Sequence, residues 1–144
     1  MRLRIVAVPV MTMLLAACAT GFHNADNPIL GLWGGYWSQK GPGQLVKVGF
    51  IGNVNTDYGT VSDYILFRCA QLAKARSMPY FLIYESLPDA VMGKAVAIPT
   101  VGSIANSNAD YVYMLTTDKM EPAAQSTESV LKKYARIVNR SAKR

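Results

Sequence analysis

The chain has 144 residues, of which 15 are Lys or Arg and 9 are Asp or Glu, so its formal net charge is +6. This length is enough for one small domain, and two cysteines are too few for a disulfide-rich scaffold. Residues 132–144 contain basic side chains and no acidic one. The positive charge therefore belongs to the end of the chain and is not a property of the domain.

The first residues have the pattern of a secretory signal peptide. A positively charged start is followed by an apolar stretch from Ile5 to Leu15 and then by small residues. The stretch is too short to span a bilayer as a helix. Residues 15–18, LAAC, have the form of a bacterial lipobox, in which the Cys is diacylated and becomes the new N-terminus. We expect residues 1–17 to be removed and Cys18 to carry lipid.

Two forms of processing remain open from the sequence. Cleavage after Ala19 also satisfies the small-x-small rule and would give a soluble periplasmic or secreted protein. The lipobox is favoured because Cys18 adjoins the apolar stretch, and acyl chains on it, palmitate among them, would anchor the protein stably. Ala19 in place of Asp resembles lipoproteins sorted to the outer membrane, where they face the periplasm. With Cys18 lipidated, Cys69 has no partner for an internal disulfide.

Residues 18–44 are rich in Gly, Asn and Pro and show no hydrophobic periodicity. This composition predicts an irregular, lipidated tether that precedes the domain. Its aromatic residues Trp33, Tyr36 and Trp37 are unusual for a linker. We expect them to fold back onto the domain, or alternatively to form a docking patch or a membrane-surface contact.

Regular elements are expected from Leu45 onward. Alternating apolar residues predict a half-buried strand up to residue 51. After a turn, Thr60 as N-cap and Asp63 fit a capping box, and the helix should run to about Arg76 because a proline follows at position 79. The aromatic and β-branched residues 80–85 predict a second strand.

Residues 87–109 are expected to form a long excursion around a short apolar run at 95–98. A further strand is predicted over 111–117 and a last helix from about Ser126. The order β-α-β-(β)-β-α predicts an α+β fold, a small two-layer sandwich with helices on one face of a 3–4-stranded sheet. We place this single domain at 45–139 and a basic tail at 140–144.

Three segments resemble, in the same order, motifs of a family of small proteobacterial envelope lipoproteins of uncharacterised function. They are Phe50–Asn53 (FIGN), Asp63–Arg68 (DYILFR) and Tyr80–Ile83 (YFLI). The Gly-Gly-Tyr sequence at 34–36 is similar to the family's lead-in, and the likeness covers about residues 34–86. It departs at 77–79, Ser-Met-Pro, where members usually have Gly. The resemblance implies an anchored periplasmic domain and implies no reaction.

The residues themselves do not form a catalytic or ligand-binding motif. The loop before the first helix contains neither Gly-x-Gly-x-x-Gly nor Gly-Lys-Ser/Thr, which argues against nucleotide binding. The single histidine, His23, lies outside the expected domain, so no Cys or Ser has a His partner and no metal ligand set exists. Asp57 and Asp63 fit a turn and a cap better than an acid–base pair. We therefore expect no catalytic residue, no metal and no cofactor.

The expected function is that of a lipid-anchored, non-catalytic structural or interaction module of the envelope. A sensor or accessory subunit of an envelope or secretion machine is the alternative, and a small hydrolase would need a pocket joining residues 53–60 and 87–109. The candidate interaction residues are Trp33, Tyr36, Trp37, Tyr64 and Phe67, each of which has packing within the chain as its plainer explanation.

The basic tail offers a second candidate contact. Arg140, Lys143 and Arg144 lie beyond the expected end of the last helix. They are either solvated or in contact with anionic lipid headgroups, lipopolysaccharide or peptidoglycan. An envelope protein is the other candidate partner, and nucleic acid is not expected in the periplasm.

Overall fold

The structure, a computed structural model, describes residues 19–27, 31, 34–104 and 107–141, with the backbone alone at 103, 104 and 107. Its strands form one antiparallel sheet in the order β1-β2-β5-β3-β6, and β4 pairs with β5 off this path. The elements are β1 (Gly35–Lys40), β2 (Val46–Ile51), α1 (Tyr58–Ala75), β3 (Tyr80–Tyr84), α2 (Leu87–Val91), β4 (Gly102–Ile104), β5 (Ser107–Thr117), β6 (Gln125–Ser126) and α3 (Thr127–Ser141).

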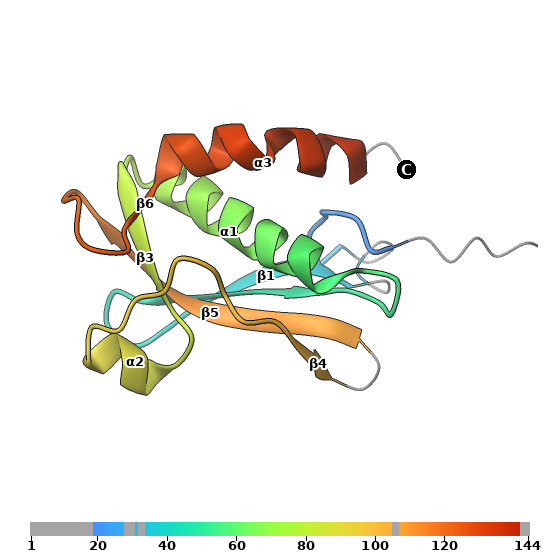
Figure 1. Ribbon diagram of the computed structural model, residues 1–144, viewed down its shortest axis with the longest axis horizontal. Coiled ribbons are helices and arrows are strands. Elements are labelled where there is room, and N and C mark those ends of the chain that lie inside the picture. Colours follow the sequence, from blue (N-terminus) through green and yellow to red (C-terminus); the bar gives the residue numbers. More distant parts are fainter. Residues whose placement is uncertain (1–18, 28–30, 32–33, 105–106, 142–144) are drawn as a thin grey trace, which may run out of the picture.

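The predicted α+β sandwich is confirmed. Helix α1 lies across one face of the sheet, and α3 is stacked against α1 on the same side (Figure 1). The sheet is larger than the expected 3–4 strands because β1, β4 and β6 join it. Strands β4 and β6 contain 3 and 2 residues, too few for an alternating pattern to be visible in the sequence.

The core lies between α1 and the inner face of the sheet. Because side chains alternate along a strand, Val46, Val48 and Phe50 of β2 all point to this face and are buried. The stripe predicted on α1 is present, since Val61, Ile65 and Cys69 are fully buried against it. The largest fully buried side chains of the described residues include Phe50, Phe81, Ile65, Ile83 and Met114.

The start of α1 differs from the predicted capping box. The N-cap is Asp57, whose Oδ1 accepts a hydrogen bond from the Thr60 backbone N–H at 2.8 Å. Hydrogen bonds from Thr60 lower the pKa of Asp57, since they stabilise its charged form. Asp63 does not act as a cap. It lies one turn further on, where burial raises its pKa despite the nearby Lys133.

Tyr64 and Phe67 are buried, so the plainer of the two expectations, packing within the chain, is confirmed for both, and they do not form an exposed interaction patch. Tyr64 is 2% exposed and Phe67 9% exposed. The pattern of α1 was interpreted with one buried stripe, but the helix is covered twice, by the sheet below and by α3 above (Figure 1). Val130, Tyr134 and Val138 of α3 complete the hydrophobic cluster on that second side.

The excursion between β3 and β5 contains the short helix α2 and the strand β4. The strand expected at 95–98 is reduced to one bridge, in which Val96 donates its N–H to the Ile83 carbonyl at 2.9 Å. The ordered pairing occurs later, where β4 and β5 form a hairpin. None of the helices in the described part of the chain has the length and apolar character that a membrane span requires.

Candidate functional site

The predicted candidate residues fall into three groups in the structure. Cys18, Trp33, Lys143 and Arg144 lie outside the described residues. Arg140 is exposed in the last turn of α3. The remaining four residues lie on two different sides of the sheet. Three of them are on the inner side, namely Tyr36, Tyr64 and Phe67, and Trp37 is on the outer side.

The residues that directly follow Cys18 are docked on the domain, which corrects the prediction of a tether. Thr20 is buried, and its N–H donates to Thr56 Oγ1 at 2.9 Å. Two residues later, the Phe22 N–H donates to Ser141 Oγ at 3.3 Å, so the segment touches the end of α3 as well. These two bonds join the N-terminal segment to parts of the chain 36 and 119 residues away.

The docked segment continues along the edge of the sheet. Asn24 forms a parallel bridge with Tyr36. The Tyr36 N–H donates to the His23 carbonyl, and the Ala25 N–H donates to the Tyr36 carbonyl, each at 2.8 Å. This backbone pairing covers part of the free edge of β1. Residues 35–40 were expected to be irregular because glycines and mixed polar residues hide the strand alternation.

Phe22 is the side chain that anchors the segment. Its ring centroid lies 4.6 Å from that of Tyr36, 5.4 Å from that of Tyr64 and 5.3 Å from that of Phe67. The Arg68 guanidinium stacks on Tyr36, with Cζ 4.4 Å from the ring centroid. The inner-side aromatics therefore bind the chain's own Phe22, a residue that sequence reasoning missed because it lies in a stretch without periodicity.

The loop between β2 and α1 forms the other half of this receptor. Thr56 is fully buried, and its hydroxyl accepts from the Thr20 N–H and donates to Asn53 Oδ1 at 3.1 Å. Its carbonyl accepts from Asn108 Nδ2 at 2.6 Å, which ties the loop to β5. The Gly-Asn turn of the family-like motif thus holds Thr56 in place for the N-terminal segment, and its polar groups bond within the chain.

The outer face of the sheet carries a cluster of aromatic rings around one lysine, hereafter the outer aromatic cluster (Trp37, Lys47, Tyr111 and Tyr113). Lys47 Nζ lies 3.8 Å from the Tyr111 ring centroid, 5.7 Å from that of Trp37 and 5.9 Å from that of Tyr113. Trp37 lies over Gly49, where a Cβ would stand 2.3 Å from the indole ring.

The outer aromatic cluster lies on the open part of this face. Leu82 and Tyr84 of β3 are buried on the same side of the sheet, so the face is accessible over β1, β2 and β5 only. Tyr111 remains exposed in its cluster, so this surface offers an aromatic ring for apolar contact and the Lys47 charge for anionic groups. The arrangement of rings around one lysine is suited to binding a partner surface.

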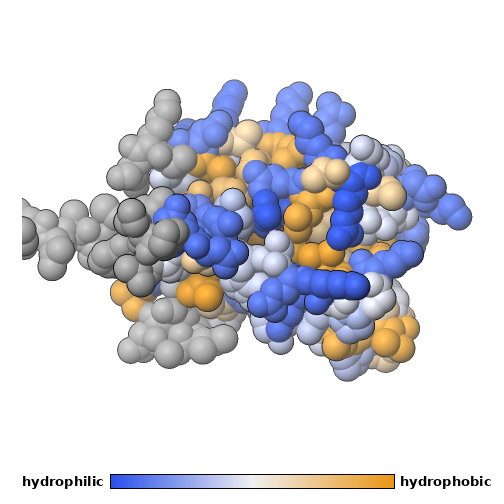
Figure 2. Space-filling model, turned by 180° about the vertical axis from the view of Figure 1, so that it is seen from behind, coloured by the Kyte–Doolittle hydropathy of each residue, from blue (hydrophilic) through white to orange (hydrophobic). Residues whose placement is uncertain are grey.

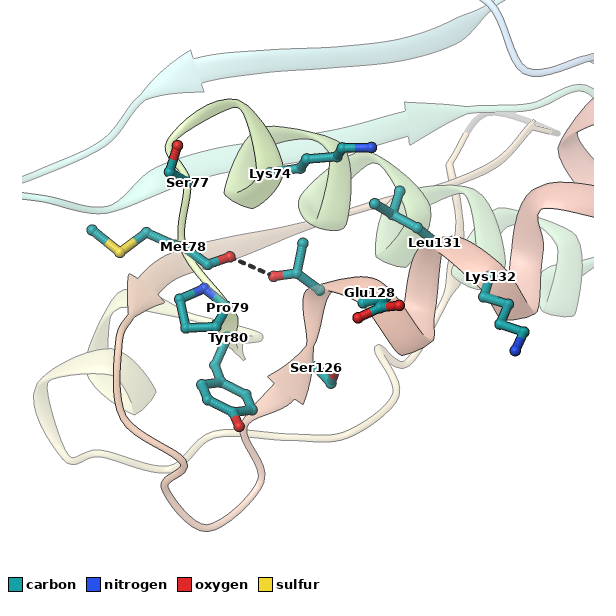
Figure 3. Close-up of a pocket in the computed structure, with 10 residues that line it drawn as sticks. Lys74, Ser77, Met78, Pro79, Tyr80, Ser126, Glu128, Leu131 and Lys132 are labelled. Atoms are coloured by element: carbon teal, nitrogen blue, oxygen red, sulfur yellow. Dashed lines mark hydrogen bonds between the residues drawn. The ribbon is translucent and has the colours of Figure 1, made fainter.

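A groove of about 810 Å³ lies where the α1–β3 turn meets the start of α3 (Figure 3). It is lined by charged and polar side chains, among them Lys74, Glu128 and Lys132. Thr127 crosses its floor, donating its N–H to the Pro79 carbonyl at 2.9 Å and its hydroxyl to the Met78 carbonyl at 2.8 Å. The groove is thus a seam between two elements, and its floor groups are already bonded within the chain.

Among the other described titratable groups, burial shifts the pKa of Cys69 and of Asp110. Cys69 is a free, buried thiol whose pKa burial raises well above its usual value, which disfavours the nucleophilic thiolate. Burial also raises the pKa of Asp110, with Glu85 adding repulsion. In the part of the chain that the structure describes, no group of three or more His, Cys, Asp or Glu could hold a metal ion.

Hydrophobic residues on the face seen in Figure 2 form several separate patches between hydrophilic side chains.

Comparison of the chain with models of protein families, with curated proteins and with solved structures finds no match. The functional argument therefore depends on the geometry of the docked N-terminal segment and of the outer aromatic cluster.

Proposed function

We propose that the chain is a lipid-anchored protein of the outer membrane that faces the periplasm and acts as a non-catalytic interaction module. The observation that carries this proposal is the burial of Thr20 against Thr56, two residues after the lipobox cysteine. A lipid on Cys18 would be attached almost directly to a folded domain. The domain would then present its side faces to partners at the membrane surface.

The anchor has a direct test in the Cys18→Ala variant. Without the thiol no acyl chain can be attached, so this variant should move from the membrane fraction to the soluble periplasmic fraction. Mass spectrometry of the native protein should find a mature N-terminus that begins at Cys18 and carries diacylglycerol. Cys69→Ala is the matched control, since it removes the other thiol, and it should remain in the membrane. An unmodified native protein that begins at Thr20 would exclude the lipoprotein.

The partner is expected on the open sheet face, at the outer aromatic cluster. A photo-crosslinking amino acid at Tyr111 should give adducts in intact cells, because Tyr111 is exposed beside Lys47 and Trp37. The same group at Met120, which is exposed three residues beyond the end of β5, should give no adducts or different ones. Equal adduct patterns at both positions would contradict a specific surface here.

The chemistry of the adducts would decide between the classes of partner. Adducts sensitive to protease contain a protein, those sensitive to muramidase contain peptidoglycan, and those resistant to both are consistent with lipopolysaccharide. A recurrent protein adduct that belongs to a larger assembly would favour the alternative function, an accessory or sensor subunit of an envelope machine.

A further inference from the structure

One end of the molecule gathers segments from both ends of the chain. The start of the docked N-terminal segment, the loop between β2 and α1, and the end of α3 lie at the same end (Figure 1). The hydrogen bonds from Thr20 to Thr56 and from Phe22 to Ser141 join all three of these segments. This end is called the anchor end below, and it consists of residues 19–22, 51–58 and 140–141.

The distance from Cys18 to the anchor end is short. Two residues of fully extended chain span at most about 7 Å, so the Cys18 Cα lies within about 7 Å of the Thr20 Cα. The headgroup layer on one side of a bilayer is about 5–8 Å thick. A lipid on Cys18 would therefore bring the side chains around Thr20 to the level of the headgroups. A free tether of residues 18–44 would instead have allowed about 28 Å between lipid and domain.

The anchor end exposes apolar side chains that no element of the described residues covers. Val54, at the tip of the loop, is 66% exposed, and Ile51 and Tyr58 on either side of it are exposed as well. An aliphatic tip flanked by a tyrosine is suited to the interfacial region of a bilayer, where an amphipathic ring and apolar side chains are both stabilised.

The described charges of the anchor end balance, since it contains one cation, Arg140, and one carboxylate, Asp57. Arg140 is exposed in the last turn of α3, and Lys143 and Arg144 follow in the sequence. The acidic residue of the anchor end is Asp57, whose charge is engaged by the Thr60 N–H and hydroxyl. Cations near a membrane surface are attracted by anionic headgroups at about 1 kcal/mol each.

We infer that the anchor end lies on the membrane surface, with Val54 in the headgroup region and Arg140, in the last turn of α3, beside anionic lipid headgroups. This inference rests on the proposed lipid anchor at Cys18 and adds a fixed orientation to it. The sheet then stands away from the membrane along its strands. The outer aromatic cluster is presented sideways, toward partners in the same membrane layer.

The test compares two positions in the full-length lipidated protein. Val54→Cys and Met120→Cys replace exposed apolar residues at opposite ends of β5, since Ile51 pairs with Ala109 and Met120 follows Thr117. The strand from 109 to 117 separates them by about 26 Å. A fluorescent label reacts with the introduced thiol only, because Cys69 is fully buried. The proteins are placed in vesicles of phosphatidylethanolamine and phosphatidylglycerol.

We expect acrylamide in the water to quench the label at position 54 several-fold less than the label at 120. Nitroxide-bearing lipids should quench only the former. Equal acrylamide quenching at both positions would overturn the inference. A label at 54 that is shielded in cells but exposed in vesicles would also overturn it, because a protein and not lipid would then cover this end. Flotation of the same samples separates the two claims: protein that fails to float with vesicles refutes the anchor, whereas floating protein with an exposed label refutes only the orientation.

Discussion

Replacing Phe50 with Ala is expected to lower the free energy of unfolding by about 3–5 kcal/mol. Phe50 is 0% exposed on the inner face of β2, which lies between β1 and β5, and its ring centroid lies 4.9 Å from that of Tyr64. Truncation removes the buried apolar area and leaves a cavity that α1 and the sheet cannot both close. Small domains are stable by about 5–15 kcal/mol, so the variant should remain folded but unfold at much lower urea concentration.

Ile51→Ala is the matched control for the core substitution. Ile51 is the next residue of the same strand but points to the opposite side and is 43% exposed. We expect a loss of about 1 kcal/mol or less for the purified protein, since little area leaves the core. Urea titration followed by circular dichroism gives both values. Equal losses at the two positions would contradict the assignment of the inner face.

Gly34→Ala should have the second large effect, because Gly34 lies where the chain passes between Ile51 and the docked segment. A Cβ here would stand 2.1 Å from the Ile51 carbonyl oxygen and 3.3 Å from Thr20 Cγ2, at a φ of +97°. The backbone conformation alone costs an alanine about 1–3 kcal/mol, and the clash with main-chain atoms adds to it. We expect a total loss of about 3 kcal/mol or more, with faster hydrogen exchange at the Thr20 and Phe22 amides.

Gly43→Ala separates the conformational cost from the clash. Gly43 also has a positive φ, +59°, but no atom lies within 4 Å of the Cβ that alanine would add. Its cost should be about 1–2 kcal/mol, without any change in exchange at Thr20. If both glycine variants lost the same free energy, the close approach of the N-terminal segment at Gly34 would be wrong. In lipidated Gly34→Ala protein, a label at Val54 should also lose part of its protection from acrylamide.

The long periodic elements could be predicted from the sequence. The alternation of Val46, Val48 and Phe50 identified the inner face of β2, and the spacing of Val61, Ile65 and Cys69 identified the inner stripe of α1. Both predictions succeeded because a strand of 6 residues and a helix of 18 residues repeat their buried positions often enough to be recognised. The helix start was misplaced by a few residues, since Asp57 and Thr60 both have side chains that suit a cap.

Other features were decided by tertiary contacts alone. Trp37 and Tyr111 are 74 positions apart in the chain and meet because β2 pairs with both β1 and β5. Tyr64 and Phe67 are buried by segments that are distant in the sequence, since Tyr64 packs on Phe50 of β2 and Phe22 contacts both rings. No local pattern in the sequence records which segment will cover the second side of a helix.

The sequence by itself determined α1 and α3, the strands β2 and β3, most of β5, the α+β class and the presence of a lipobox-like LAAC segment. The tertiary structure decided that the segment after Cys18 is docked on the domain and is not a tether. The reason is physical. Residues 19–27 have no periodicity of their own, and their order comes from hydrogen bonds to Thr56 and Ser141 and from the ring contacts of Phe22. Such partners are supplied by the folded chain and cannot be recognised within the segment itself.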